Sequence, residues 1–336
     1  MALALGSGGA RGYAHIGVIT ELRERGYRIV GIAGSSMGAL VGGLYAAGKL
    51  DEFSEWARSL TQRAILRLLD PSITAAGVLR AEKILDAVHD ILGTVTIERL
   101  PIPFTAVATD LLAGKSVWLQ RGRLDEAIRA SIAIPGVIAP YATDGRLLAD
   151  GGILDPLPMA PIAAAGAALT IAVSLGGTET HGSRDTEPKA TSEWLNRMVR
   201  STSALFDISA ARSLLDRPTA RAMLQRFGAS NSESDGAPAP AYVGQPAGDV
   251  EEAEVPKLGT FEVMNRTIDI AQAALARHTL AAYPPDVLIE IPRSTCRSLD
   301  FHRAAEVIAA GRMLAARALD TLETGTEEAA PTALET

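Results

Sequence analysis

Short apolar runs alternate with amphipathic stretches along most of this 336-residue chain. Residues 2–5 and 29–33 are two such runs, and a glycine-containing turn and a helix-like segment follow each of them. Further strands are predicted over 147–149, 169–174 and 287–291, and helices over 39–47, 261–282 and 300–322. Strands and helices that alternate in this way are typical of an α/β domain, and a chain of this length can bury its core.

The stretch 157–177 carries no charged residue over 21 positions, which is nearly the length of a membrane-spanning helix. Pro158, Pro161 and Gly166 interrupt it, and proline disfavours a continuous helix. A short helix over 162–168 followed by a buried strand explains the pattern better, so no transmembrane segment is expected.

The character of the chain changes over 178–260, which we interpret as an insertion. Apolar residues recur at helical spacing over 191–227, whereas 228–258 is rich in Ser, Pro, Ala, Gly and acidic residues and is typical of a disordered loop. The insertion is either a surface addition or a cover over a functional site, with Trp194 and Phe206 on an exposed apolar face.

The chain is therefore expected to divide into four parts: a core over 1–177, the insertion over 178–260, a returning core segment over 261–322 and a frayed acidic tail over 323–336.

Composition excludes several classes of protein. The formal net charge is −7 and no stripe of Lys and Arg is present, so neither nucleic-acid binding nor electrostatic docking on an anionic membrane is expected. Cys296 is the only cysteine, which excludes an internal disulfide and fits a cytoplasmic protein. No signal peptide is expected, and no group of His, Cys and acidic residues has the spacing of metal ligands, so no metal or other cofactor is predicted.

Residues 34–38 read Gly-Ser-Ser-Met-Gly and stand between an apolar run and a helix-like segment. A G-x-S-x-G pentapeptide in this setting is typical of a nucleophile elbow, a tight turn that exposes one serine hydroxyl. A Cβ at Gly34 or Gly38 would collide with the strand or with the first turn of the helix. Ser36 is therefore predicted to be a nucleophile at a helix N-terminus, where the helix dipole favours developing negative charge.

A glycine loop follows the first apolar run, because residues 6–12 read Gly-Ser-Gly-Gly-Ala-Arg-Gly. Strand, glycine loop and helix in this order present backbone N–H groups to an anion. The dinucleotide fingerprint fails because Arg11 stands at its third glycine, and a P-loop fails because no Lys-Ser or Lys-Thr follows. With a nucleophilic serine close in sequence, the loop is predicted to be an oxyanion hole.

The general base is predicted to be a carboxylate. None of the five histidines lies in a glycine-rich setting, and His15 and His302 fall in helical patterns. Asp150 ends an apolar run and precedes Gly151 and Gly152, which by itself is an ordinary turn sequence. With an activated serine in a chain poor in histidine, this pattern favours a Ser–Asp dyad.

Together, the glycine loop, the serine pentapeptide and Asp150-Gly151-Gly152 resemble the patatin-like phospholipases, specifically the bacterial branch similar to the catalytic domain of neuropathy target esterase. The resemblance covers residues 2–175, including the segment 129–140, and resumes over 261–315. It implies a three-layer α/β/α patatin-like fold with a mainly parallel central sheet and an inserted helical or disordered segment.

The resemblance also implies roles for individual residues. Ser36 would be the nucleophile and Asp150 the general base; the oxyanion hole would be formed by Gly8, Gly9, Ala10 and Arg11, with Gly12, Gly34, Gly38, Gly151 and Gly152 supporting the motifs. The substrate would be a lipid ester such as a lysophospholipid or phospholipid, reached through peripheral membrane contact. Ser7 stands where the family loop commonly has a further glycine, and a positive φ there would cost about 1 kcal/mol.

Two other functions stay open at this point. A general carboxylesterase with a Ser36–Asp150–His triad would use His278 or His302, which follow the acid in the required order. A catalytically silent regulatory protein would use the same acyl pocket as a lipid sensor.

Overall fold

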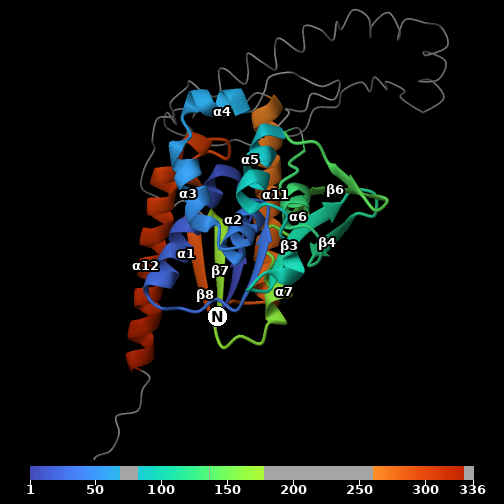
Figure 1. Ribbon diagram of the computed structural model, residues 1–336. Coiled ribbons are helices and arrows are strands. Elements are labelled where there is room, and N and C mark those ends of the chain that lie inside the picture. The colour runs from blue at the N-terminus through green and yellow to red at the C-terminus, as the bar shows by residue number, and fades with distance from the viewer. Residues whose placement is uncertain (69–81, 136, 178–259, 329–336) are drawn as a thin grey trace, which may run out of the picture. The chain divides into compact units, whose positions relative to one another are not determined.

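The computed structural model describes residues 1–68, 82–135, 137–177 and 260–328 (Figure 1). Contacts within the chain define two compact units, Met1–Gly182 with Arg266–Thr336, and Ser183–Asn265. The second unit lies almost wholly outside the described residues, as do the predicted helical and disordered parts of the insertion. All the strands described here belong to the first unit.

In the part of the chain that the structure describes, eight strands form one mixed sheet with the order β5-β6-β3-β2-β1-β7-β8, and β4 pairs with β3. Strands β3, β2, β1, β7 and β8 run parallel, and β4, β5 and β6 add antiparallel pairings at one edge. The bounds are β1 Ala2–Leu5, β2 Gly31–Ser35, β3 Phe104–Asp110, β4 Lys115–Leu119, β5 Tyr141–Thr143, β6 Arg146–Asp150, β7 Thr170–Gly177 and β8 Val287–Pro292. The mainly parallel sheet predicted from the sequence is thus confirmed.

The helices lie on both faces of this sheet. The described α-helices are α1 Ala14–Glu24, α2 Met37–Ala46, α3 Leu50–Ser59, α4 Gln62–Leu68, α5 Glu82–Leu92, α6 Leu124–Ser131, α7 Met159–Ala163, α11 Thr260–Ala282 and α12 Ala304–Glu328. Short 3-10 turns are η1 Gly9–Tyr13, η2 Ile97–Arg99, η3 Gly151–Ile153, η4 Arg293–Thr295 and η5 Phe301–Arg303.

Side chains of β1 show how the two faces are covered, because they alternate between them. Leu3 and Leu5 belong to a large core with α1, α2, α3 and α12. Ala2 and Ala4 belong to a smaller core formed with α7, against which α11 packs. This is the expected three-layer arrangement, and Figure 1 shows α12 lying along α1 beside the sheet.

The order in which the chain adds strands to the sheet reverses at β1: β2 and β3 lie on one side of it, and β7 and β8 lie on the other. The chain passes from β1 through α1 on one face to β2, whereas β7 lies on the other side of β1 and the chain reaches β8 through α11 on the opposite face. In open α/β sheets, a crevice forms outside the carboxyl ends of two strands whose connections leave on opposite faces. The glycine loop after β1 lies at this crevice.

Within the described residues, the predicted elements match the observed ones in type, with shifts at their ends. The short helix expected over 162–168 is α7, which begins earlier, at Met159. The tail prediction was wrong in part, because α12 continues to Glu328. Leu322 packs against the core and Glu323 accepts hydrogen bonds from Arg25 and Tyr27, so this end of the helix is held in place.

Candidate active site

Ser36 occupies a sharp turn between β2 and α2. Its φ is 55° and its ψ is −122°, a backbone conformation that non-glycine residues rarely adopt. The turn is tight because its flanks touch: a Cβ at Gly34 would lie 2.3 Å from the Gly38 carbonyl, and a Cβ at Gly38 would lie 2.0 Å from the Leu5 carbonyl oxygen. These short distances confirm the prediction that a side chain at Gly34 or Gly38 would collide with a strand or with the first turn of the helix.

The hydroxyl of Ser36 donates a hydrogen bond directly to Asp150, with 2.5 Å between Oγ and Oδ2. Both side chains are buried, with relative exposures of 1% and 3%. The structure therefore brings together two residues that lie 114 positions apart in sequence. Asp150 reaches this position at the end of β6, the antiparallel neighbour of β3.

Asp150 is held in one orientation by its own turn. Its second oxygen, Oδ1, accepts the backbone N–H of Gly152 at 2.7 Å. Burial raises the pKa of Asp150 from 3.8 to about 6, although the hydrogen bonds from Ser36 and Gly152 lower it. A carboxylate with this pKa is ionised at neutral pH and is a better proton acceptor than an exposed aspartate.

Ser131, to which the sequence analysis gave no role, holds the backbone of the elbow. Its Oγ accepts the N–H of Ser36 at 2.9 Å and donates to the carbonyl of Val107 at 2.6 Å. Ser131 is fully buried at the end of α6. Its only signal in the sequence was its place in the segment 129–140 that contributed to the family resemblance.

The glycine loop is fixed from several sides. Gly9 has a φ of +58°, and a Cβ there would lie 2.3 Å from the carbonyl oxygen of Ser298, so only glycine fits. The buried imidazole of His15 lies 2.8 Å from the carbonyl oxygen of Gly6, and burial lowers the pKa of this histidine to about 4. Neutral His15 therefore donates its Nε2–H to the loop.

The expectation that the N–H of Ala10 is open needs correction, and the strain considered for Ser7 is absent. The N–H of Ala10 donates to the carbonyl of Ser298 at 2.8 Å, so it is already engaged rather than open to an oxyanion. The side chain of Arg11 is buried and donates to the carbonyl of Gly8, so it holds the loop together. Ser7 has no positive φ, which removes the strain considered for it. The N–H groups of Gly8 and Gly9 have no hydrogen-bond partner among the described residues.

Neither histidine of the alternative triad is bonded to the dyad. His278 is exposed on α11 and His302 lies in η5, and neither is hydrogen-bonded to Ser36 or Asp150 in the described structure. In a triad a histidine would separate the acid from the serine. Here the acid contacts the serine directly.

An apolar pocket of about 780 Å³, its open mouth included, begins at Ser36. Ser36, the hydroxyl of Tyr13 and the indole N–H of Trp56 are the polar side-chain groups among its lining residues. Its wall comes from η1, α2, α3, α4, α5, the segment after α6 and the segment before α12. The lining residues are Gly9, Tyr13, Ser36, Met37, Leu40, Phe53, Trp56, Leu60, Ile65, Ile84, Ile132, Ile134, Val137, Ile138, Leu299 and Phe301. A pocket of this kind accepts a hydrocarbon chain and excludes a charged ligand.

Comparison with known proteins identifies the family. The model for "Patatin-like phospholipase" matches residues 3–163, a span that contains the glycine loop, Ser36 and Asp150. An uncharacterized NTE family protein of Mycobacterium tuberculosis is 74% identical over 343 residues, which cover 100% of this chain and 95% of the relative. The chain belongs to the NTE family of patatin-like phospholipases. An NTE family protein of Mycobacterium bovis has the same identity and coverage.

Other relatives of this patatin-like protein are more distant. Neuropathy target esterase sws of Drosophila melanogaster is 33% identical over 184 residues, covering 53% of this chain and 13% of the esterase. The crystal structure of VipD from Legionella pneumophila aligns with a TM-score of 0.44 and 16% identity, covering 95% of this chain and 66% of that one. Among the described helices, none has the length and apolar composition needed to cross a membrane.

Proposed function

We propose that this protein is a serine hydrolase that cleaves the acyl ester bonds of lipids, with lysophospholipids and phospholipids as its substrate class. Membership of the patatin-like phospholipase family supports a lipid acyl hydrolase. The observation that carries the proposal is the 2.5 Å hydrogen bond between Ser36 Oγ and Asp150 Oδ2 at one end of an apolar pocket.

In the proposed reaction, Ser36 attacks the ester carbonyl as its proton passes to Asp150. The N–H groups of Gly8 and Gly9 stabilise the oxyanion of the tetrahedral intermediate. Asp150 then returns the proton to the departing alcohol, which leaves Ser36 acylated. Water, deprotonated by Asp150, attacks the acyl-enzyme and releases the fatty acid, and Ser36 regains its proton.

The shape of the site gives the acyl chain a place. The apolar pocket begins at Ser36 and continues between Phe53, Trp56 and Phe301, so a chain lying there would bring its ester carbonyl to the nucleophile. The rival triad loses support, because the direct contact between Ser36 and Asp150 leaves no position for a histidine between them.

The test is hydrolysis of a short p-nitrophenyl ester and of a panel of lysophospholipids by Ser36→Ala. We expect loss of essentially all turnover with an unchanged fold, since one hydroxyl is removed. Ser35→Ala is the matched control: Ser35 Oγ is buried without a hydrogen-bond partner in the described structure, so this change should leave activity near normal. More than a few per cent of activity in Ser36→Ala would contradict the assignment.

A further inference from the structure

A second pocket lies at the crevice beside β1, behind the glycine loop. It encloses about 630 Å³, its open mouth included. Ser7 and Arg11 line it from the loop after β1, and Ser174 lines it from β7. It is thus built on the two strands whose connections leave on opposite faces of the sheet, where ligands of open α/β proteins bind. It does not include Ser36.

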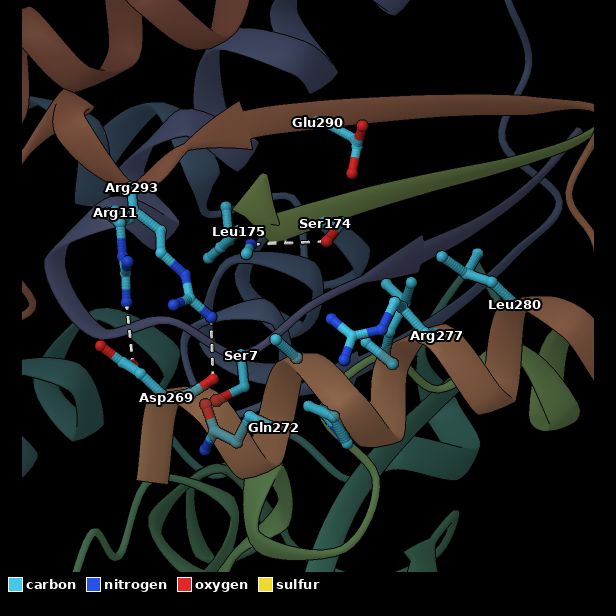
Figure 2. A pocket seen from close by; sticks show the side chains of 15 residues that line it. Ser7, Arg11, Ser174, Leu175, Asp269, Gln272, Arg277, Leu280, Glu290 and Arg293 are labelled. Atoms are coloured by element: carbon cyan, nitrogen blue, oxygen red, sulfur yellow. Dashed lines mark hydrogen bonds and ion pairs between the residues drawn. The ribbon is translucent and has the colours of Figure 1, made fainter. Parts of the chain in front are cut away.

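Helix α11 forms one wall of this pocket with a single face. Its lining residues recur at intervals of three and four positions: Asp269, Gln272, Ala273, Ala276, Arg277 and Leu280. The end near Leu280 is apolar, whereas the end near Asp269 is polar. Figure 2 shows Arg11 and Arg293 reaching Asp269, with Arg277 extending from α11 further along the pocket.

The lining of the pocket as a whole carries more positive than negative charge. Three arginines (Arg11, Arg277 and Arg293) line the pocket with two carboxylates (Asp269 and Glu290), which leaves one net positive charge. Arg11 and Arg293 share Asp269: Arg11 Nη2 lies 3.2 Å from its carboxylate, and Arg293 Nη2 donates to its backbone carbonyl at 2.8 Å. Arg277 makes no hydrogen bond or ion pair with any residue that the structure describes.

The pocket also adjoins the proposed catalytic residues. A Cβ on Gly152, whose N–H binds Asp150, would lie 2.3 Å from Ser7 Oγ and 2.7 Å from Gln272 Nε2. Two lining side chains of the pocket therefore pack directly against the turn that orients Asp150. A ligand in the pocket would sit one residue layer away from the dyad.

We infer that this pocket binds a phosphate-type anion through Arg277 and Arg293, with Arg11 fixing the loop on its inner side. The planar guanidinium donates paired N–H groups that match phosphate oxygens. The anion is either the phosphate of a lipid head group, in which case the inference rests on the proposed function, or a free phosphate that binds beside the site.

Binding is tested by calorimetric titration of the full-length protein with inorganic phosphate. Arg277→Gln should weaken binding roughly fivefold, because an exposed guanidinium still contributes charge-assisted hydrogen bonds. Glu290→Gln should strengthen binding, since it removes a repelling carboxylate. Arg317→Gln is the matched control: Arg317 is an exposed arginine on α12, which covers the other face of the sheet, and phosphate binding should not change.

Turnover distinguishes the two sources of the anion. For a lipid head group, Arg277→Gln should raise KM for decanoyl glycerophosphate and leave KM for decanoyl glycerol unchanged. For a free ligand, phosphate should alter the rate on both esters in the native protein and less so in Arg277→Gln. No phosphate binding by the native protein, or equal weakening in Arg277→Gln and Arg317→Gln, overturns the inference. Because binding needs no turnover, Ser36→Ala should still bind phosphate, and this result separates a failure here from a failure of the proposed function.

Discussion

Replacing Asp150 by asparagine should inactivate the protein and stabilise it at the same time. Asparagine is nearly isosteric and keeps a carbonyl oxygen for the N–H of Gly152, and its amide can donate to Ser36. What it loses is the ability to accept a proton and the charge that is buried at neutral pH. We expect kcat to fall by roughly 10²–10⁴, with a smaller change in KM.

The gain in stability follows from the pKa of Asp150. Because burial raises this pKa from 3.8 to about 6, the folded protein binds a proton more tightly than the unfolded chain does. Below about pH 4 the carboxyl of Asp150 is protonated in both the folded and the unfolded protein, so its burial does not lower the free energy of unfolding. As pH rises through the window between the two values, ionising the buried carboxylate removes about 3 kcal/mol from the free energy of unfolding. The asparagine variant does not suffer this loss.

Urea unfolding at pH 5 and pH 8 measures the effect. The stability of Asp150→Asn relative to the native protein should increase between these pH values by about half of the full difference, since the remainder falls below pH 5. Asp144→Asn, in the exposed turn between β5 and β6, should show no such increase. An identical difference at both pH values for Asp150→Asn would refute the reasoning, because the carboxylate would then not titrate in this window.

The ionisation of Asp150 should raise the rate of hydrolysis, whereas it lowers the stability of the protein. The value of kcat/KM for a soluble ester is expected to rise with pH, to reach half of its plateau at about pH 6, where half of Asp150 is ionised, and to level off above about pH 7. Asp155 has a similarly raised pKa of about 6 because of burial, but it is not bonded to Ser36. Asp155→Asn should therefore keep this pH profile. If that variant lost the profile, the titrating group would be Asp155 and the assignment to Asp150 would be wrong.

Two further changes test the groups that hold the site. Ser131→Ala leaves the buried N–H of Ser36 without its acceptor, so we expect a loss of roughly 1–3 kcal/mol in stability and a lower kcat, read from urea unfolding and ester hydrolysis. His15→Leu removes the donor to the carbonyl of Gly6 and should lower kcat more than tenfold with little change in KM, whereas His15→Gln, which keeps an N–H donor, should retain more activity; equal activity of the two variants would contradict a role for this bond.

The local parts of the fold were predictable because their signals are local. The elbow at Ser36 needs two glycines at fixed spacing, and the Cβ distances at Gly34 and Gly38 show why. The alternation of apolar runs with helical stretches predicts an α/β domain, and the resemblance to the patatin-like family implies its mainly parallel sheet. In contrast, no local sequence pattern predicts the antiparallel edge made by β4, β5 and β6. The pairing of these strands depends on which strand remains unpaired at the end of the sheet.

Apart from the Ser36–Asp150 pair, the contacts between distant segments at the site were not predictable from the chain itself. The hydrogen bond from the N–H of Ser36 to Ser131 joins residues 95 positions apart, and a serine at the end of a helix gives no sign of such a partner. The engagement of Ala10 by the carbonyl of Ser298 depends on a segment nearly 290 residues away. Sequence reasoning could assign the chemistry of the glycine loop, but only the structure divides its N–H groups into engaged and open ones.

The glycine loop is best understood as a partition between two unlike environments. On one side lies the apolar pocket that begins at Ser36, and on the other lies the pocket with Arg277 and Arg293. Arg11 is buried within the partition and bonds to the carbonyl of Gly8 and to Asp269, so it ties the loop to α11. A hydrocarbon chain and an anionic group thus each find a matching surface on opposite sides of a few residues. The pocket with Arg277 and Arg293 follows from the position of β1 between β2 and β7, since connections that leave on opposite faces open a crevice outside the end of β1.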